Sequence, residues 1–313
     1  MRKRIALLLS MLMLTGCGAT PAPPAETVES ITLEEETLVT GEVAPRESFT
    51  YEAIVIQYSD TEYTENDIPL FTYEFNKPHL VVYRADGTPI SSPDGMRYVD
   101  GKPAQTPAEQ QALAIAEAFN AEFAHWKSLE VFEDMLQPAR EELAFYQEEG
   151  YEWYGGHYLE LNSSVYQTER MVSVDAYIGS YTGGAHPNHL LLSWNFDLTT
   201  GEFFEAEALA ADVEEFSDQV TKEIIRQANI RAAESDMEPE ELFWEDYQEI
   251  AADWSSRAVS FDETGMKVGY SHYEMACYAA GAQEFELTYQ QLLPGLSDHG
   301  RELLGLSETE SYD

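Results

Sequence analysis

The chain has 313 residues, and its 17 basic and 58 acidic side chains give a formal charge of −41 at pH 7. A chain this acidic repels phosphate groups, which excludes non-specific nucleic-acid binding as a function. Hydrophobic residues make up 44% of the sequence, enough for one large domain or two modest ones. The acidity is most simply a solvated surface without a partner, the alternative being a surface that attracts basic proteins or divalent cations.

The first residues have the pattern of a secretory signal peptide. Residues 2 to 4 are basic, and residues 5 to 14 form an apolar run that is too short to span a bilayer permanently. Small residues then precede Cys17, an ending that resembles the bacterial lipobox. The resemblance implies cleavage after residue 16 and acylation of Cys17. We therefore expect a lipid-anchored, extracytoplasmic protein, the alternative being an ordinary signal peptide with a cysteine there by chance.

Residues 17–50 are rich in Pro, Thr and Glu, which predicts a disordered tether. Loss of the three early basic residues would leave 14 basic against 58 acidic residues, a net charge of −44. Cys277 would then be the one cysteine free of lipid, so no intramolecular disulfide is expected. Its apolar neighbours predict a buried side chain rather than a nucleophile.

Residues 51–150 predict an N-terminal α+β domain. Strands are expected around residues 53–56 and 70–83, with Pro78 causing a bulge or dividing the second run into two strands. Thr106 to Glu109 form a capping box. Apolar residues then recur at helical spacing and predict one long helix: Ile115, Phe119, Phe123, Trp126, Leu129, Phe132 and Leu136. Pro138 is expected to break or kink it, and Gly150 to end a second helical piece.

Residues 151–313 predict a C-terminal domain of strands and helices. Apolar residues alternate in 172–178 and in 190–196, which predicts two half-buried strands. Helices are expected after Asp212 and Pro239, followed by a hairpin over residues 259–270 and a strand at 285–289. The expected fold class is α+β, with a mixed, mainly antiparallel sheet, packed helices and two associated domains.

The loop between the two alternating stretches carries a recognisable motif. Tyr181-Thr-Gly-Gly-Ala-His186, followed by Asn195-Phe-Asp-Leu-x-Thr-Gly201, resembles the RsiV-like C-terminal domain of bacterial extracytoplasmic proteins. That domain occurs in a lysozyme-sensing anti-sigma factor and in many lipoproteins. The resemblance implies a binding module but identifies no ligand. Anti-sigma activity is not carried over, because a signal and a lipid cysteine replace the cytoplasmic segment and transmembrane helix of that factor.

The candidate ligand-contact residues lie in this loop: Tyr181, Thr182, Gly183, Gly184 and His186. Paired glycines permit positive φ or close approach of a partner to the backbone, and tyrosine is a frequent anchor in interfaces. The alternative is that the glycines only shape the turn and that Tyr181 belongs to the core.

The histidines raise the question of a metal. His186 and His189 stand three residues apart, and His157 and Asp197 are expected in the same sheet. A metal site needs such groups to converge at ~2.0–2.2 Å from one point. Without an HExxH helix or a cysteine pair, histidines that hydrogen-bond the turn or face a ligand are favoured. No metal and no cofactor are therefore expected.

The sequence contains no nucleophile elbow, phosphate-binding loop or dinucleotide fingerprint. No catalytic residues are expected. The predicted function is non-catalytic binding at the cell envelope, with lysozyme or a cell-wall component as candidate ligands. The alternative is a cell-wall hydrolase. A shielded pocket that joins His186 to a carboxylate would favour the hydrolase, whereas an open face around the loop would favour binding.

Overall fold

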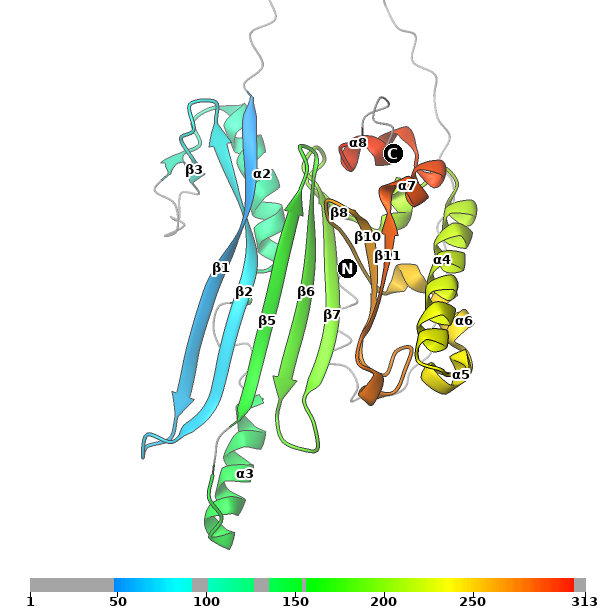
Figure 1. Ribbon diagram of the computed structural model, residues 1–313. Coiled ribbons are helices and arrows are strands. Elements are labelled where there is room, and N and C mark those ends of the chain that lie inside the picture. Colours follow the sequence, from blue (N-terminus) through cyan, green and yellow to red (C-terminus); the bar gives the residue numbers. More distant parts are fainter. Residues whose placement is uncertain (1–47, 92–100, 127–134, 154–155, 307–313) are drawn as a thin grey trace, which may run out of the picture. The chain divides into compact units, whose positions relative to one another are not determined.

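The computed structural model describes residues 48–91, 101–126, 135–153 and 156–306 (Figure 1). All described elements belong to the unit Glu47–Asp313. The expected signal peptide, Cys17 and nearly all of the expected tether therefore lie outside the described residues.

A six-stranded sheet organises this unit, in the order β1-β2-β5-β6-β7-β8. Its strands are β1 Phe49–Tyr63, β2 Pro69–Arg84, β5 His157–Gln167, β6 Met171–Tyr181, β7 Asn188–Asp197 and β8 Glu202–Phe204. β2 and β5 are parallel and the other neighbours are antiparallel. The α+β prediction with a mixed, mainly antiparallel sheet is confirmed. The sheet joins strands from both sides of Gly150, so the division into two domains is not confirmed.

Pro78 lies within an uninterrupted β2, and the prediction of a bulge or a break there was wrong. The register between β1 and β2 shifts only at Glu62. Pairing of β2 with β5 ends at Asn76, so a residue without an N–H group loses no ladder bond on that side. The set of side chains that β2 contributes to the core changes instead. Before Pro78 these are odd-numbered residues such as Phe75, and after it they are even-numbered residues such as Leu80. A short pair, β3 Ile90–Ser91 and β4 Lys102–Pro103, follows.

The helix α2, Pro107–Glu122, covers one face of this sheet. Its predicted capping box is confirmed, because Thr106 accepts from the backbone N–H of Glu109 and the Glu109 carboxylate accepts from the backbone N–H of Thr106. The helix is shorter than predicted: it ends at Glu122, although Phe123 and Trp126 are still buried beyond it. Leu129 and Phe132 lie outside the described residues. The apolar stripe contributes to a core with side chains of the sheet, including Phe119, Phe123, Val174, Trp194 and Phe196.

The helix α3, Leu136–Glu149, begins just before Pro138 rather than being broken by it. Proline is tolerated in a first helical turn because its missing N–H would have no intrahelical partner. Gly150 ends the helix with φ 72°, as predicted. Leu70, Ala139 and Leu143, with the half-buried Trp153, form a small core beneath α3. Leu136, at the start of the helix, is buried in the larger core of the sheet.

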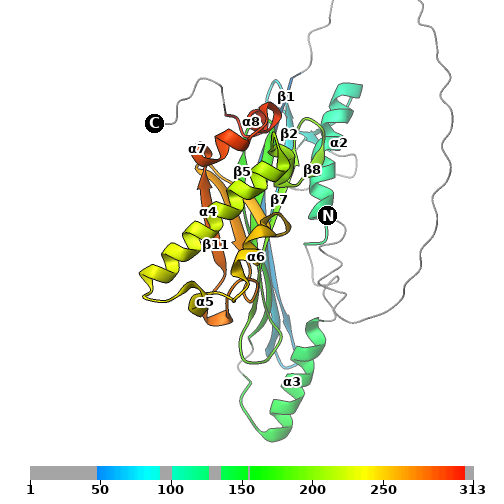
Figure 2. The ribbon, with the colours of Figure 1, turned by 90° about the vertical axis from the view of Figure 1, so that its right-hand side faces the viewer.

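A second sheet, in the order β11-β10-β9, lies on the other face of the first sheet, over β6 and β7 (Figure 2). Its antiparallel strands are β9 Ala258–Phe261, β10 Gly265–Tyr270 and β11 Gln283–Thr288, which confirms the predicted hairpin. Because both faces of β6 are covered, residues 171–174 are all buried, and the prediction of a half-buried strand was wrong for this part.

Polar side chains join the two sheets. The N–H of Phe261 donates to Ser173 Oγ at 2.8 Å, and the N–H of Val259 donates to Ser193 Oγ at 2.6 Å. Asn195 accepts from the Ser173 hydroxyl at 2.8 Å and donates to the carbonyl of Val259 at 2.9 Å. Ser173 and Asn195 are buried, and these bonds satisfy polar groups that burial would otherwise leave unpaired.

Helices cover the outer face of the second sheet. α4, Val213–Glu234, is capped by Asp212 as predicted and buries Phe216, Val220 and Ile224. The helix predicted after Pro239 is instead two short ones, α5 Pro239–Leu242 and α6 Tyr247–Ala252. The chain then ends its described part with α7 Tyr289–Leu292 and α8 Asp298–Leu303. Among the described helices, none has both the length and the apolar character needed to cross a bilayer.

Candidate functional site

The motif loop lies at the end of the six-stranded sheet where β6 joins β7 (Figure 1). We call residues 182–187 the signature loop, because β6 extends to Tyr181 and β7 starts at Asn188. The beginning of β5, with His157, lies at the same end of the sheet, since Tyr158 pairs with Tyr181. The segment 271–281, which connects β10 to β11, also reaches this loop through its side chains.

The two glycines of the signature loop have backbone conformations that favour glycine. Gly183 has φ 94° and Gly184 has φ 103°. A methyl group added to Gly183 would lie 3.4 Å from Glu142 Oε2 and 3.8 Å from His157 Cε1, whereas one added to Gly184 would meet nothing within 4 Å. Gly183 therefore packs closely against the side chains of Glu142 and His157, whereas the space beside Gly184 is open. The half-buried Tyr181 donates its hydroxyl to the Gly184 carbonyl at 2.9 Å and so supports the turn.

His157 and Glu142 form the pair beneath the loop. The His157 side chain is 1% exposed, and its Nε2 pairs with Glu142 Oε2. Its Nδ1 is buried without a hydrogen-bond partner. This contact connects α3 to the first residue of β5 across a separation of 15 residues in sequence.

Aromatic rings extend from this pair along α3. We call Phe145, Tyr146, Tyr151 and Trp153 the α3 aromatic cluster. Successive ring centroids are 6.5 Å apart for Phe145–Tyr151, 5.9 Å for Tyr151–Tyr146, 5.7 Å for Tyr146–Trp153, 5.7 Å for Trp153–His157 and 5.6 Å for His157–Tyr181. The rings therefore form a continuous series from the α3 aromatic cluster through His157 to Tyr181, the last residue before the signature loop.

A second group of rings lies on the other side of the loop. We call His186, His189, His272, Tyr273 and Tyr278 the histidine–tyrosine cluster. The His186 ring stacks on Tyr278 with centroids 3.8 Å apart. Its Nδ1 lies 3.0 Å from the Pro187 carbonyl and its Nε2 lies 3.1 Å from the Tyr273 hydroxyl. A neutral ring with its proton on Nδ1 satisfies both contacts, donating to the carbonyl and accepting from the hydroxyl.

The remaining histidines of this cluster extend it towards the sheet. His189 Nδ1 is hydrogen-bonded to the Tyr177 hydroxyl, and its ring centroid lies 4.9 Å from that of His272. Burial, followed by the nearby His189 and His186, lowers the pKa of His272. Burial, followed by the Glu160 carboxylate and neighbouring tyrosines, raises the pKa of Tyr177 to about 12. His272 and Tyr177 are therefore held in their neutral forms at neutral pH.

The four groups weighed as metal ligands are not brought together. His157 pairs with Glu142, and Asp197 accepts from the backbone and hydroxyl of Thr199 in its own turn at 2.7 and 2.6 Å. His186 and His189 belong to the histidine–tyrosine cluster instead. Among the residues described, no group of three or more His, Cys, Asp or Glu side chains is arranged to hold a metal ion.

Sequence reasoning missed most of the residues around the loop. The tyrosines of segment 271–281 are conspicuous in the sequence, but no sequence pattern places them near the loop. No sequence pattern indicates that the aromatic residues of α3 lie near the loop either. Cys277 is exposed, and the prediction that it is buried was wrong. It immediately precedes a short 3-10 turn, Tyr278–Ala280, and points away from the core, while the preceding Met275 and Ala276 fill it.

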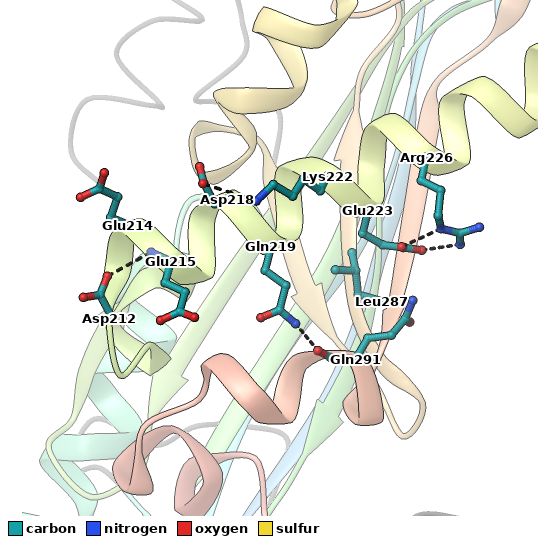
Figure 3. Close-up of a pocket in the computed structure, with 10 residues that line it drawn as sticks. All are labelled: Asp212, Glu214, Glu215, Asp218, Gln219, Lys222, Glu223, Arg226, Leu287 and Gln291. Carbon is teal, nitrogen blue, oxygen red and sulfur yellow. Dashed lines mark hydrogen bonds and ion pairs between the residues drawn. The ribbon is translucent and has the colours of Figure 1, made fainter.

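An open acidic groove lies elsewhere, between α4 and α7, with a volume of about 780 Å³ (Figure 3). Its two basic side chains are paired within it: Lys222 lies 3.6 Å from Asp218, and Arg226 donates to Glu223 at 2.8 Å. Gln219 crosses the groove to the Gln291 carbonyl. The charges of the groove are thus partly compensated within α4.

Comparisons with known proteins concern the fold. No protein-family model matches the chain, and no curated protein matches it. A solved structure of a DUF3298 family member from Bacteroides fragilis has 14% identity and a TM-score of 0.48, covering 84% of this chain and 99% of that one. A DUF3298 family protein from Pseudomonas aeruginosa has 15% identity and a TM-score of 0.44, covering 81% and 96%. Both of these structural neighbours are thus bacterial DUF3298 proteins.

Proposed function

We propose that this chain is a non-catalytic binding protein of the bacterial cell envelope, and that the signature loop and the histidine–tyrosine cluster contact its ligand. The observation that carries this proposal is the exposed Tyr273. Its side chain is 55% exposed, yet its hydroxyl is fixed by His186, which is itself stacked on Tyr278. An aromatic side chain that is already ordered loses little conformational entropy on binding, which suits it as an interface anchor.

The surroundings of His186 favour binding over hydrolysis. A hydrolytic site needs a general acid or base whose protonation is set by a nearby partner, and a pocket that excludes water. The hydrogen bonds described for His186 go to a tyrosine hydroxyl and a backbone carbonyl, and neither partner is a carboxylate. Gly184 beside it faces open space. A cell-wall hydrolase therefore remains the weaker candidate.

Lysozyme is the first candidate ligand, and a cell-wall component is the second. Lysozyme is a basic protein, this chain is strongly acidic, and its signature motif resembles a lysozyme-sensing domain. Charge alone would give fast but salt-sensitive and unspecific attraction. A specific complex of standard size buries ~1,200–2,000 Å² in total, which needs a shaped surface around the loop.

The test is a titration of the full-length chain with lysozyme at low and at physiological salt, beside an unrelated basic protein of similar charge. Specific binding survives physiological salt, exceeds the unrelated protein, and weakens on Tyr273→Ala. Tyr63→Ala is the matched control, because Tyr63 is 56% exposed on β1, three strands from β6 in the sheet order. If both basic proteins bind alike and salt releases both, lysozyme is excluded as a specific ligand. Purified cell wall is then tested with the same two variants.

The lipid anchor is the second part of the proposal, and it rests on the sequence before Cys17. Cys17→Ser blocks acylation, so the variant loses its lipid label and its retention in the membrane fraction. A variant that keeps the mobility, the lipid label and the membrane location of the wild type rules out the anchor at this residue.

A further inference from the structure

We propose that the outward side of α3 is a second contact surface, and that it binds a cationic polypeptide segment whose arginine or lysine side chains lie over Phe145 and Tyr151. This inference rests on the proposed binding function and assigns a separate surface and a partner chemistry to it.

Exposed aromatic rings are the first observation. Phe145 is 55% exposed and Tyr151 is 60% exposed, with ring centroids 6.5 Å apart. Neither side chain belongs to the core beneath α3, which Ala139 and Leu143 form with Leu70. Adjacent exposed rings on a soluble protein indicate an interaction site, since water disfavours their apolar faces.

The charge around these rings determines the partner. Residues 136–153 contain five glutamates and one arginine, which gives 1 − 5 = −4. Glu148 and Glu149 are exposed and occupy the last turn of α3, where no basic residue is present. The C-terminal end of a helix carries partial negative charge, so it repels these carboxylates. A cation placed there relieves this repulsion and can also lie over a ring face.

The surface is also connected to the signature loop. The ring sequence from Phe145 ends at Tyr181, and Glu142 on the same helix pairs with His157 beneath Gly183. The two contact surfaces therefore adjoin, and one extended basic partner can reach both of them. A surface of standard size is more readily assembled from two adjoining patches than from one loop.

The experiment measures binding of a fluorescent hexa-arginine peptide to the full-length chain at physiological salt. Tyr151→Ser keeps every charge and removes one ring, so it weakens binding about threefold to fivefold if the ring contacts the cation. Tyr63→Ser is the control, because Tyr63 is equally exposed and also has acidic neighbours. Thermal unfolding followed by circular dichroism checks that both variants are folded.

A second pair of variants tests the carboxylates. Glu148→Gln with Glu149→Gln is compared with Glu214→Gln with Glu215→Gln, an exposed adjacent pair at the start of α4. The α3 pair should weaken hexa-arginine binding more than the α4 pair. The proposal is overturned if Tyr151→Ser binds like the wild type, or if both glutamate pairs weaken binding equally.

A failure of the α3 surface can be distinguished from a failure of the proposed function. Loss of lysozyme or cell-wall binding on Tyr273→Ala with no effect of Tyr151→Ser on the peptide would remove the α3 surface alone. The reverse result would remove the role of the histidine–tyrosine cluster and keep α3 as a cation-binding surface.

Discussion

Glu142 on α3 holds the buried imidazole of His157 on β5, directly beneath Gly183 of the signature loop. This polar pair links the helix to the sheet beside the small core under α3. A change in either residue therefore acts on α3 and on the loop together.

Removing the Glu142 carboxylate should destabilise the protein. Glu142→Ala leaves His157 buried with neither ring nitrogen paired, which costs about 1–3 kcal/mol. Glu141→Ala is the matched control, because Glu141 is exposed and the same Glu-to-Ala change alters the helix propensity equally. Its free energy of unfolding should stay within about 0.5 kcal/mol of the wild type. Urea unfolding measures both. Equal effects of the two substitutions would mean that the pair contributes no stability of its own.

The Tyr181 hydroxyl should hold the signature loop closed on itself. Tyr181→Phe keeps the ring beside His157 and removes the bond to the Gly184 carbonyl. Amide hydrogens of residues 182–185 should then exchange about five to tenfold faster, because a loop hydrogen bond contributes about 1 kcal/mol. Hydrogen–deuterium exchange with mass spectrometry measures this. Unchanged exchange in the loop would show that the glycine conformations alone define the turn.

Stability should fall with acidification from about pH 6.5 towards pH 4. Burial, followed by the charge of Lys77, lowers the pKa of His79 from 6.5 to about 4. In that window the unfolded chain takes up a proton that the folded chain does not, so the free energy of unfolding decreases, by about 3 kcal/mol at the limit. His272 acts in the same direction.

Urea unfolding at several pH values checks this dependence. His79→Gln should flatten it, and substitution of the exposed His299 by Gln should leave it as in the wild type. A pH dependence that survives His79→Gln unchanged would assign the effect to other groups.

Cys277 should react with a thiol reagent in the native protein, because its side chain is exposed. Iodoacetamide labelling without denaturant, followed by peptide mapping, should find complete modification at this residue. Cys277→Ser should remove the label and change the free energy of unfolding by less than about 0.5 kcal/mol, as for other exposed positions. Labelling that requires denaturant would contradict the exposed position.

Local chemistry made part of the fold predictable. The capping box at Thr106, the Asp212 cap and the Gly150 stop each depend on a few neighbouring residues, and all three are confirmed. Features set by tertiary contacts were missed. The strand β6 is buried on both faces at its start because a second sheet covers it, and alternation in sequence cannot show what lies above a strand.

The candidate site was predictable only in its loop. The paired glycines have the positive φ angles that their sequence suggested. The partners of the loop come from distant segments: Tyr273 is 87 residues from His186, and Glu142 reaches His157 from a different element. Such pairings follow from strand order and sheet stacking, which no local pattern encodes. Cys277 illustrates the same limit, since an apolar neighbourhood in sequence did not determine which way its side chain points.

The polar bonds between the two sheets have a consequence for alignment. Shifting β9 by one residue along β6 and β7 would turn its side chains to the opposite face. It would also break the bond that Ser173 accepts from the N–H of Phe261 and the bond that Asn195 donates to the carbonyl of Val259, at about 1–3 kcal/mol for each buried group left unpaired. These bonds therefore oppose a small slide of the second sheet. Segment 271–281 connects two strands of that sheet, so the position of Tyr278 against His186 depends on the same alignment.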